Sequence, residues 1–437
     1  MDVIVERVAG LDVHQATITA CILVSNTTRK KHNSEKIRRT FGTVRAALEE
    51  LKAWLLEHRI THVAMEATGI YWKCVHDILE DDFDVTVANA RHIQNVPGRK
   101  TDMSDAEWIA TLLRYGLLKK SFVPKKEFRA LRDLTRQRRG FVNDRSSVRN
   151  RIQKLLEARG VKLATFVSDV FGVSGMEMLR ALAEGQLDPR EMAKLARARM
   201  RQKIPELTLA LDGRLDEVHR TQLQLFLQQH QHIEQLITTI EALIKQHIAI
   251  HRVQIARLCT IPGVDEITAI EIIGELGIDL TSFPSASHLA SWAGVCPGNH
   301  LSAGKSQGGR RRKGNPYLQS ILFEAAFGAT RTKGSFLRAK YFKLKARRGH
   351  MRALMAIAHR LLTAVYAIIT RGELYKELGE AHLDTANKSR VIRQLGKRLH
   401  TLGFAIVPLD NDDTEKAEAL LRMLQQAQPQ KDRGVTS

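Results

Sequence analysis

The sequence of 437 residues has little of several residue types that define common classes of protein. Its four cysteines are far apart and form no C-x-x-C pair, which argues against a disulfide scaffold or a structural zinc site. Aromatic residues make up only 5% of the chain, so we do not expect extensive base stacking on aromatic side chains. No uncharged apolar run approaches the roughly 18–20 residues that span a bilayer, and residues 1–14 lack the apolar core of a signal peptide. We therefore expect a cytoplasmic protein with no membrane partner.

Acidic residues are also scarce. The chain has 68 Lys+Arg against 47 Asp+Glu, a formal net charge of +21. Residues 301–350 contain 13 basic residues and a single acid, Glu324, and residues 101–150 contain 12 basic and six acidic residues. Because clustered lysines and arginines neutralise phosphates, we expect a nucleic-acid partner and an association with the nucleoid during activity. The length and a hydrophobic content of 43% indicate a globular protein of two or three domains.

Residues 1–120 alternate between strand and helix patterns and predict a mixed α/β domain. Strands are expected at 8–12, 17–24, 38–42, 62–67 and 84–90, and helices at 44–59, at 71–79 and from about Asp102 onward. This order is typical of a mixed central sheet covered by helices. Beyond it we expect a basic helical and coiled-coil region at 121–255, a mainly helical domain at 256–378 and a polar tail at 379–437.

The middle region carries two helical patterns. Residues 125–160 form a basic amphipathic stretch with a break expected at Gly140. Its arginines are candidate nucleic-acid contacts: Arg136, Arg138 and Arg139. Further along, isoleucines 233, 237, 240 and 244 have the spacing of a coiled coil, which fits pairing within the chain as well as pairing between chains. In the next region, Ile261–Val264 and the helical run 267–277 are typical of a helix-hairpin-helix, whose glycine turn lets backbone N–H groups approach a phosphate.

Four carboxylates stand at the ends of predicted elements in the α/β domain. Asp12 follows an apolar strand, Glu66 ends another, and Asp102 and Asp105 are three residues apart at a helix start. Each has an ordinary alternative, as a turn former, a surface residue or a helix cap. Together they predict a site for Mg²⁺ or Mn²⁺, because four carboxylates in one place require a compensating cation and these metals prefer oxygen ligands.

The segments that carry these acids resemble a known family. Gly10–His14 (GLDVH), Met65–Gly69 (MEATG) and Lys100–Ala106 (KTDMSDA) are similar to the acidic motifs of the DEDD insertion-sequence transposases. The resemblance implies a ribonuclease-H-like (RuvC-like) fold for the N-terminal domain, as in Holliday-junction resolvases. It also implies that the catalytic metal ligands are Asp12, Glu66, Asp102 and Asp105.

Residues 261–318 are similar to the C-terminal transposase domain of the same family. There a serine in a glycine-rich basic loop attacks DNA and forms a covalent 5′-phosphoserine link, and the matching residue is Ser302. Because Ala303 directly follows Ser302 and the run to the basic cluster is longer than in the family, Ser306 is the alternative nucleophile. The basic residues expected to contact phosphates and stabilise the transition state are Lys305, Arg310, Arg311, Arg312 and Lys313.

The sequence thus favours a Mg²⁺-dependent serine recombinase that moves its own mobile element. The resemblance implies duplex DNA as donor and target, a structured non-coding (bridge) RNA as guide, and a homo-oligomer, either dimer or tetramer. The alternatives are a junction-resolving nuclease that uses water with the same four acids, and a nucleic-acid-binding protein whose acids are structural.

Overall fold

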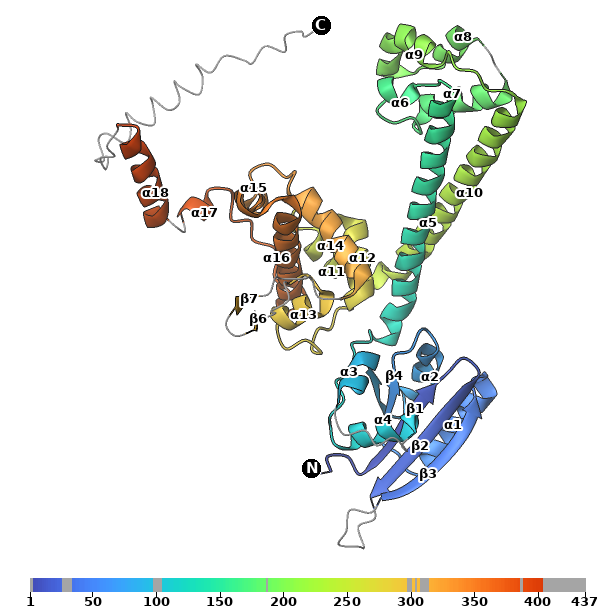
Figure 1. Cartoon of the computed structure of the whole chain (residues 1–437), viewed down its shortest axis with the longest axis vertical. Coiled ribbons are helices and arrows are strands. Elements are labelled where there is room, and N and C mark those ends of the chain that lie inside the picture. Colours follow the sequence, from blue (N-terminus) through green and yellow to red (C-terminus); the bar gives the residue numbers. More distant parts are fainter. Residues whose placement is uncertain are drawn as a thin grey trace.

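The structure, a computed structural model, describes residues 3–25, 34–96, 104–185, 188–296, 301–302, 305–306, 314–385 and 388–403. Figure 1 shows an N-terminal α/β domain, a long arm of two helices and a helical C-terminal domain at the base of the arm. The mixed α/β character of the N-terminal domain and the helical character of the remainder confirm the predicted fold class in outline.

Five strands form the sheet of the α/β domain in the order β3-β2-β1-β4-β5. The central strand β1 is antiparallel to β2, and β2 to β3, whereas β4 runs parallel to β1 and β5 parallel to β4. The strands are β1 (Arg7–Val13), β2 (Thr17–Ser25), β3 (Ser34–Gly42), β4 (His62–Glu66) and β5 (Asp84–Ala88). The helices are α1 (Arg45–Glu57), α2 (Trp72–Leu79), α3 (Ala90–Asn95) and α4 (Asp105–Arg114).

The two faces of the sheet carry different helices. On one face, Ala9 and Leu11 of β1 pack in a core with α1 and α2, and on the other, Val8 packs in a core with α4. A Cβ atom on Gly10 would lie 2.1 Å from the carbonyl oxygen of Ala106 and 2.4 Å from the backbone nitrogen of Ala110. The absence of a side chain at Gly10 therefore allows α4 to lie directly on β1.

Helix α4 begins later than the sequence pattern predicts. The predicted start is near Asp102, whereas the first helical residue is Asp105 and the N-cap is Ser104. The Ser104 hydroxyl accepts a 3.4 Å hydrogen bond from the backbone N–H of Glu107, which satisfies an N–H group that has no partner within the helix. Asp102 lies outside the described residues. Residues 90–95, which form α3, have no pattern that predicts a helix.

The arm consists of α5 (Lys126–Ala158) and α10 (Glu217–His247), which pack side by side. They are antiparallel, because Arg138 on α5 pairs with Glu241, whereas Arg149, eleven residues further along α5, pairs with Glu234. The break predicted at Gly140 is absent, and α5 continues through it. The isoleucine stripe of α10 is buried in the two cores that α5 shares, so its pairing lies within the chain: Ile233, Ile237, Ile240 and Ile244.

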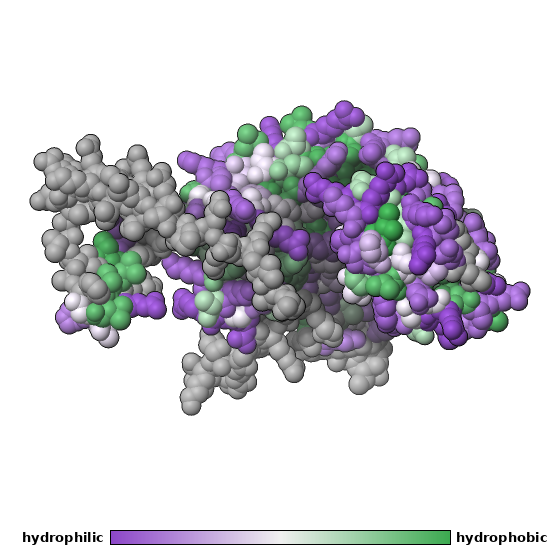
Figure 2. Space-filling model, turned by 90° about the horizontal axis from the view of Figure 1, so that it is seen from above, coloured by the Kyte–Doolittle hydropathy of each residue, from purple (hydrophilic) through white to green (hydrophobic). Residues whose placement is uncertain are grey.

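Short helices cover the tip of the arm around a separate core. They are α6 (Leu163–Phe166), α7 (Val173–Glu184), α8 (Pro189–Ala193), the 3₁₀ helix η1 (Ala198–Lys203) and α9 (Ile204–Ala210). In the view from above in Figure 2, hydrophilic side chains cover most of the coloured surface, and hydrophobic side chains form smaller patches between them.

The C-terminal domain is a helical bundle whose core also includes Phe128 and Leu131 from the base of α5. Its elements, with the 3₁₀ helix η2 (Ala249–His251) before them, are α11 (Arg252–Leu258), α12 (Glu266–Leu276), α13 (Ala286–Ala293), the hairpin of β6 (Leu301–Ser302) and β7 (Lys305–Ser306), α14 (Pro316–Ala329), α15 (Phe336–Arg348) and α16 (His350–Arg371). Beyond the bundle lie α17 (His382–Thr385) and α18 (Lys388–Thr401).

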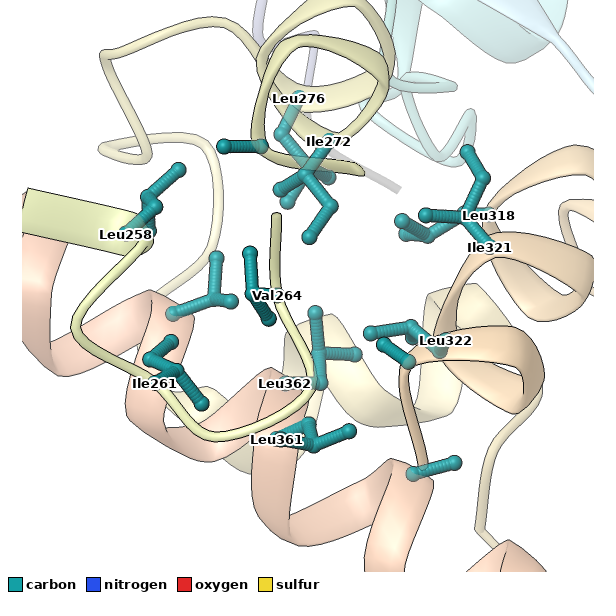
Figure 3. Close-up of a cluster of buried hydrophobic side chains, with 14 of the residues drawn as sticks. Leu258, Ile261, Val264, Ile272, Leu276, Leu318, Ile321, Leu322, Leu361 and Leu362 are labelled. Atoms are coloured by element: carbon teal, nitrogen blue, oxygen red, sulfur yellow. The ribbon is translucent and has the colours of Figure 1, made fainter. Parts of the chain in front are cut away.

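Helix α16 is long and apolar enough to cross a membrane by length and composition alone. Its apolar residues, however, pack in the core of the bundle. Figure 3 shows Leu361 and Leu362 of this helix directed at side chains from α14 and from the loop between α11 and α12. The length and hydropathy of α16 are therefore those of a central core helix.

The glycine turn of the predicted helix-hairpin-helix is used for packing. Gly263 has φ +84°, and a Cβ atom there would lie 2.2 Å from the carbonyl oxygen of Ala325 and 2.4 Å from the backbone nitrogen of Ala329. The flanking Ile261 and Val264 are buried (Figure 3). The turn faces α14, so in this structure its glycine permits close contact between two segments of backbone rather than the predicted approach of a phosphate.

Candidate functional site

Asp12 and Glu66 lie at the carboxyl ends of two adjacent parallel strands. Gly10 of β1 is paired with Ala64 of β4, so Asp12 and Glu66, each two residues further on, are neighbours. Alternate residues of a strand point to the same side, which places both carboxylates on the face of the sheet that α4 covers. The strand order thus brings together two acids that are 54 positions apart in the sequence.

Asp105 is directed to the same end of the sheet by the orientation of α4. At the far end of this helix, the carbonyl oxygen of Arg114 accepts a 3.0 Å hydrogen bond from the backbone N–H of Ile4, just before β1. Helix α4 is therefore antiparallel to β1, and its first turn lies toward the carboxyl end of that strand. Asp12, Glu66 and Asp105 consequently share one end of one face, while Asp102, the fourth predicted ligand, lies outside the described residues.

The two strand carboxylates contact a histidine and a threonine. Oδ2 of Asp12 is 3.1 Å from Nε2 of His14, and Oε1 of Glu66 accepts a 2.9 Å hydrogen bond from the hydroxyl of Thr68. Within the described part of the chain, neither carboxylate forms an ion pair with a lysine or arginine. Adjacent carboxylates without a lysine or arginine partner repel each other, and a divalent cation removes that repulsion. This donor set fits Mg²⁺ or Mn²⁺.

A second group of potential ligands is already neutralised by an arginine. Ligand atoms of His76, Asp77 and Glu80 at α2 lie within 4.8 Å of one another, the only such group of three found among the described residues. The guanidinium of Arg129 on α5 donates a 2.9 Å hydrogen bond to Glu80 and lies 3.3 Å from Asp77. We therefore assign this group to the contact between the α/β domain and the arm.

Glu107 is a buried carboxylate that the sequence motifs do not identify. It accepts a 2.7 Å hydrogen bond from Nζ of Lys36 and a second hydrogen bond from Arg38, both on β3. Burial opposes its ionisation, but these two hydrogen bonds outweigh that effect and hold the pKa of Glu107 below its usual value. The ion pairs fix the first turn of α4, and hence Asp105, on the sheet. The capping-box spacing Ser104-x-x-Glu107 is the signal in the sequence that marks this turn.

Ser302 lies in a small hairpin of the C-terminal domain. Strands β6 and β7 are antiparallel, with Ser302 opposite Lys305 and Leu301 opposite Ser306. Both candidate nucleophiles therefore belong to one hairpin. The other residues of the predicted basic cluster lie outside the described residues: Arg310, Arg311, Arg312 and Lys313.

The chain that returns from this hairpin is held firmly where α14 begins. A Cβ atom on Gly314 would lie 2.4 Å from the carbonyl oxygen of Ala293, so this contact needs glycine. The side-chain oxygen of Asn315 accepts a 3.0 Å hydrogen bond from the backbone N–H of Tyr317, and its amide donates a 2.6 Å hydrogen bond to Glu275. The chain therefore enters the bundle at a packed and hydrogen-bonded position, at the start of α14.

The three arginines predicted to contact nucleic acid are used inside the chain. Arg136 donates hydrogen bonds of 2.7 and 2.9 Å to the carboxylate of Glu275. Arg138 donates a 2.8 Å hydrogen bond to Glu241, and Arg139 donates hydrogen bonds to Glu271 (2.8 Å) and Glu324 (2.7 Å). Their charges are balanced by carboxylates, so we do not include them in the nucleic-acid surface proposed below.

These arginines instead form a buried ionic contact between the arm and the C-terminal domain. Glu275 and Glu271 on α12 are only 1% and 6% exposed. Burial raises the pKa of Glu271 despite the neighbouring Arg139, and burial lowers the pKa of Arg132 to about 10 despite the nearby Glu275. Helix α12 is otherwise apolar, and its two carboxylates, four residues apart, face arginines on α5. Their ion pairs join segments that are more than 130 positions apart in the sequence.

Removal of one buried partner should destabilise this contact strongly. We expect Glu275→Ala to lower the free energy of unfolding by about 3 kcal/mol, because it leaves buried arginine charge uncompensated. Glu241→Ala is the control, since Glu241 is 35% exposed and its loss should cost less than about 1 kcal/mol. Urea unfolding followed by circular dichroism measures both values. Equal destabilisation by the two variants would contradict the importance of the buried contact.

A groove of about 1340 Å³ lies between the α/β domain and the C-terminal domain. Residues of α2 and of 119–125 form one wall, and residues 282–283, 292 and 314–316 form the other. Two of its lysines are paired with acids, Lys120 with Asp84 at 2.8 Å and Lys125 with Asp279 at 2.9 Å. Most of the charge of this groove is therefore balanced within the protein.

Comparison with known proteins identifies two family matches and several relatives. A model of DEDD transposases of the IS110 type matches residues 9–159, and a model described as "Transposase IS116/IS110/IS902 family" matches residues 255–341. The chain is 33% identical to an "Insertion element IS110 uncharacterized 43.6 kDa protein" of Streptomyces coelicolor, over 30% of this chain and 32% of that protein. It is 32% identical to the "Transposase for insertion sequence element IS1111A" of Coxiella burnetii, over 28% of this chain and 34% of that protein.

A longer and more distant match is to the "Pilin gene-inverting protein" of Moraxella bovis, with 25% identity over 82% of this chain and 94% of that protein. By contrast, the matches to the Streptomyces and Coxiella proteins each span about a third of the relative's length. The two family matches include every predicted site residue: the four acids fall in the first match, and Ser302 with its basic neighbours falls in the second.

Proposed function

Because this chain belongs to the IS116/IS110/IS902 family of transposases, we propose that it cuts and rejoins DNA at an insertion sequence by Mg²⁺-assisted attack of a serine. The observation that carries the proposal is that Asp12, Glu66 and Asp105 lie at the same end of one face of the sheet, although their ligand atoms are not all within 4.8 Å of one another in this structure. The strand order and the parallel β1-β4-β5 segment are compatible with a ribonuclease-H-like fold, in which such acids hold metal ions.

The proposed metal ligands are Asp12, Glu66, Asp105 and, outside the described residues, Asp102. Bound Mg²⁺ or Mn²⁺ would activate an oxygen nucleophile and stabilise negative charge on the leaving oxygen. Around this position, the ion pairs of Glu107 hold the first turn of α4 in place. The described residues supply no lysine or arginine to the strand carboxylates, which keeps them available as ligands.

The proposed nucleophile is the hydroxyl of Ser302. Its oxygen attacks a phosphodiester phosphorus, forms a 5′-phosphoserine bond and breaks the bond to the 3′ oxygen, which leaves as a 3′-hydroxyl after taking up a proton. The proton of Ser302 is lost to a base as the new bond forms. Attack of another 3′-hydroxyl on the phosphoserine reverses these steps and rejoins the DNA. Lys305 and residues 310–313 would stabilise the charge on the phosphate.

The excess positive charge supports further partners of this reaction. A net charge of +21 is compatible with more than one nucleic-acid partner, and we propose that a structured non-coding RNA guides the protein to its donor and target DNA. We also propose that the active form is a homodimer or homotetramer. The isoleucine stripe of α10 is used within the chain, so the subunit interface would involve other surfaces.

Trapping of the covalent intermediate tests this function. The purified protein is incubated with DNA of the element, the RNA transcribed beside its gene and Mg²⁺, then denatured and digested. We expect a protein–DNA adduct whose phosphoserine maps to residue 302 by mass spectrometry, and no adduct in EDTA. DNA cleavage without any adduct would instead support a nuclease that uses water. Adduct formation at the full rate in EDTA would contradict the metal site.

A further inference from the structure

A second groove, of about 1290 Å³, lies on the C-terminal domain and has a basic lining. It is formed by α15 and α16, with residues 286–287, 295–296 and 323 at its edges. Of the described residues that line it, none is acidic and four are lysine or arginine: Lys340, Arg348, Arg352 and Arg360; His359 lines it as well, and burial together with Arg360 lowers its pKa. Apolar side chains between them, such as Leu344 and Met355, form the rest of the surface.

The basic residues form stripes along the two helices. On α15, Lys340, Leu344 and Arg348 are four residues apart, and on α16, Arg352 and His359 are seven residues apart, so each set lies along one side of its helix. The eight helical steps from Lys340 to Arg348 extend about 12 Å along the helix axis. This length corresponds to three or four phosphates of one strand in a duplex, at about 3.4 Å per phosphate.

The positive charge of this groove is not balanced within the protein. In the part of the chain that the structure describes, Lys340, Arg348, Arg352 and Arg360 form no ion pair with a carboxylate, unlike the arginines at the base of the arm. Glu324, the single acid in residues 301–350, is paired with Arg139. Burial, together with the nearby positive charge of Arg360, lowers the pKa of Lys340. Such a lining is complementary to a polyanion.

The chain connects this groove directly to the serine hairpin. Cys296 lines the groove, and Ser302 follows six residues later. A chain of six residues extends at most about 20 Å, so Ser302 lies within that distance of the Cys296 end of the groove. A strand that reaches the Cys296 end of the groove therefore lies within about 20 Å of Ser302, the candidate nucleophile.

We propose that this groove binds the phosphodiester backbone of the DNA strand that the serine hairpin attacks. This inference rests on the proposed function, since it takes Ser302 as the site of attack. Arg348, Arg352 and Lys340 are assigned as residues that position the DNA, with no part in the bond exchange itself. The apolar residues between them pack against deoxyribose, while the basic side chains pair with phosphates on either side.

Measurement of duplex DNA binding against salt concentration tests the groove without requiring any reaction. All variants are made in a Ser302→Ala background, and binding of a 30-base-pair duplex is followed by fluorescence anisotropy. Arg348→Gln with Arg352→Gln should reduce the slope of log K against log salt by about 1.8 and weaken binding about thirtyfold near 0.15 M salt, because two phosphate contacts are lost. Arg348→Lys with Arg352→Lys should retain most of the binding.

The matched control is Arg347→Gln with Arg371→Gln, which removes the same charge from exposed positions on the same helices outside the groove. Equal weakening by both pairs of substitutions would overturn the proposal, as would weakened binding to a structured RNA with unchanged binding to DNA. If the wild type forms no adduct but the groove variants lose DNA binding as expected, the proposed chemistry fails and the groove assignment stands. If adducts form and the groove variants bind DNA like the control variant, the groove assignment fails and the proposed chemistry stands.

Discussion

Replacement of Ser302 by alanine is expected to abolish the covalent protein–DNA adduct. The serine oxygen is the atom that bonds to phosphorus in the proposed reaction, and alanine has no nucleophile to replace it. Because only one hydroxyl is removed and no positive charge is lost, DNA binding should stay within about twofold of wild type. Adduct formation is measured on denaturing gels with labelled DNA, and binding is measured separately by anisotropy.

Ser306→Ala is the matched control for this prediction, since it removes the same group from the paired strand of the same hairpin. We expect it to retain adduct formation. The opposite result, with loss of the adduct in Ser306→Ala and retention in Ser302→Ala, would assign the nucleophile to Ser306. Adducts in both single variants would contradict a serine of this hairpin as the nucleophile.

Loss of a proposed metal ligand is expected to reduce the rate of strand cleavage strongly. Asp12→Asn or Glu66→Gln should lower the rate of strand cleavage about a thousandfold or more, because metal stabilisation of charge in the transition state is worth several kcal/mol. The amides are close in size to the acids but neutral, so the sheet should fold as before. Binding of Mn²⁺, followed by the electron paramagnetic resonance signal of the free ion, should weaken in the same variants.

Glu57→Gln provides a charge-matched control, because Glu57 is exposed on α1, on the opposite face of the sheet from α4. It should leave both the cleavage rate and Mn²⁺ binding unchanged. Retention of cleavage by Asp12→Asn, or a loss of Mn²⁺ binding in Glu57→Gln equal to that in Glu66→Gln, would contradict the assignment of the site.

The strands of the α/β domain were predictable because a half-buried or buried strand has a short apolar run bounded by turns. Strands β1, β2, β4 and β5 lie where those runs occur. The start of α4 was harder, since Asp102, Ser104 and Asp105 are all residues that cap helices, and only the observed hydrogen bond from Glu107 to Ser104 identifies the cap. The antiparallel orientation of α4, which places Asp105 at the same end of the sheet as Asp12, follows from packing over Gly10 and has no local signal.

The partners of the arginines on α5 could not be predicted from the sequence of that helix alone. A run of basic residues has the same sequence whether it faces solvent, nucleic acid or carboxylates from another domain. The partners Glu271 and Glu275 lie far along the chain in a helix that is otherwise apolar, and only the folded contact between α12 and α5 pairs them. The basic groove could be predicted only in part: Lys340 and Arg348 fall in the basic window 301–350, but Arg352 and Arg360 come from a second helix, and the packing of the two helices sets the lining.

The uninterrupted course of α5 through Gly140 also sets a length scale for any partner. At 1.5 Å per residue, its 33 residues extend about 50 Å, from the core of the C-terminal domain to the core at the tip of the arm. A nucleic acid that contacts both ends at once must span about this distance. For a straight B-form duplex at 3.4 Å per base pair, that is about 15 base pairs, so shorter fragments can occupy one end of the arm but cannot reach the other.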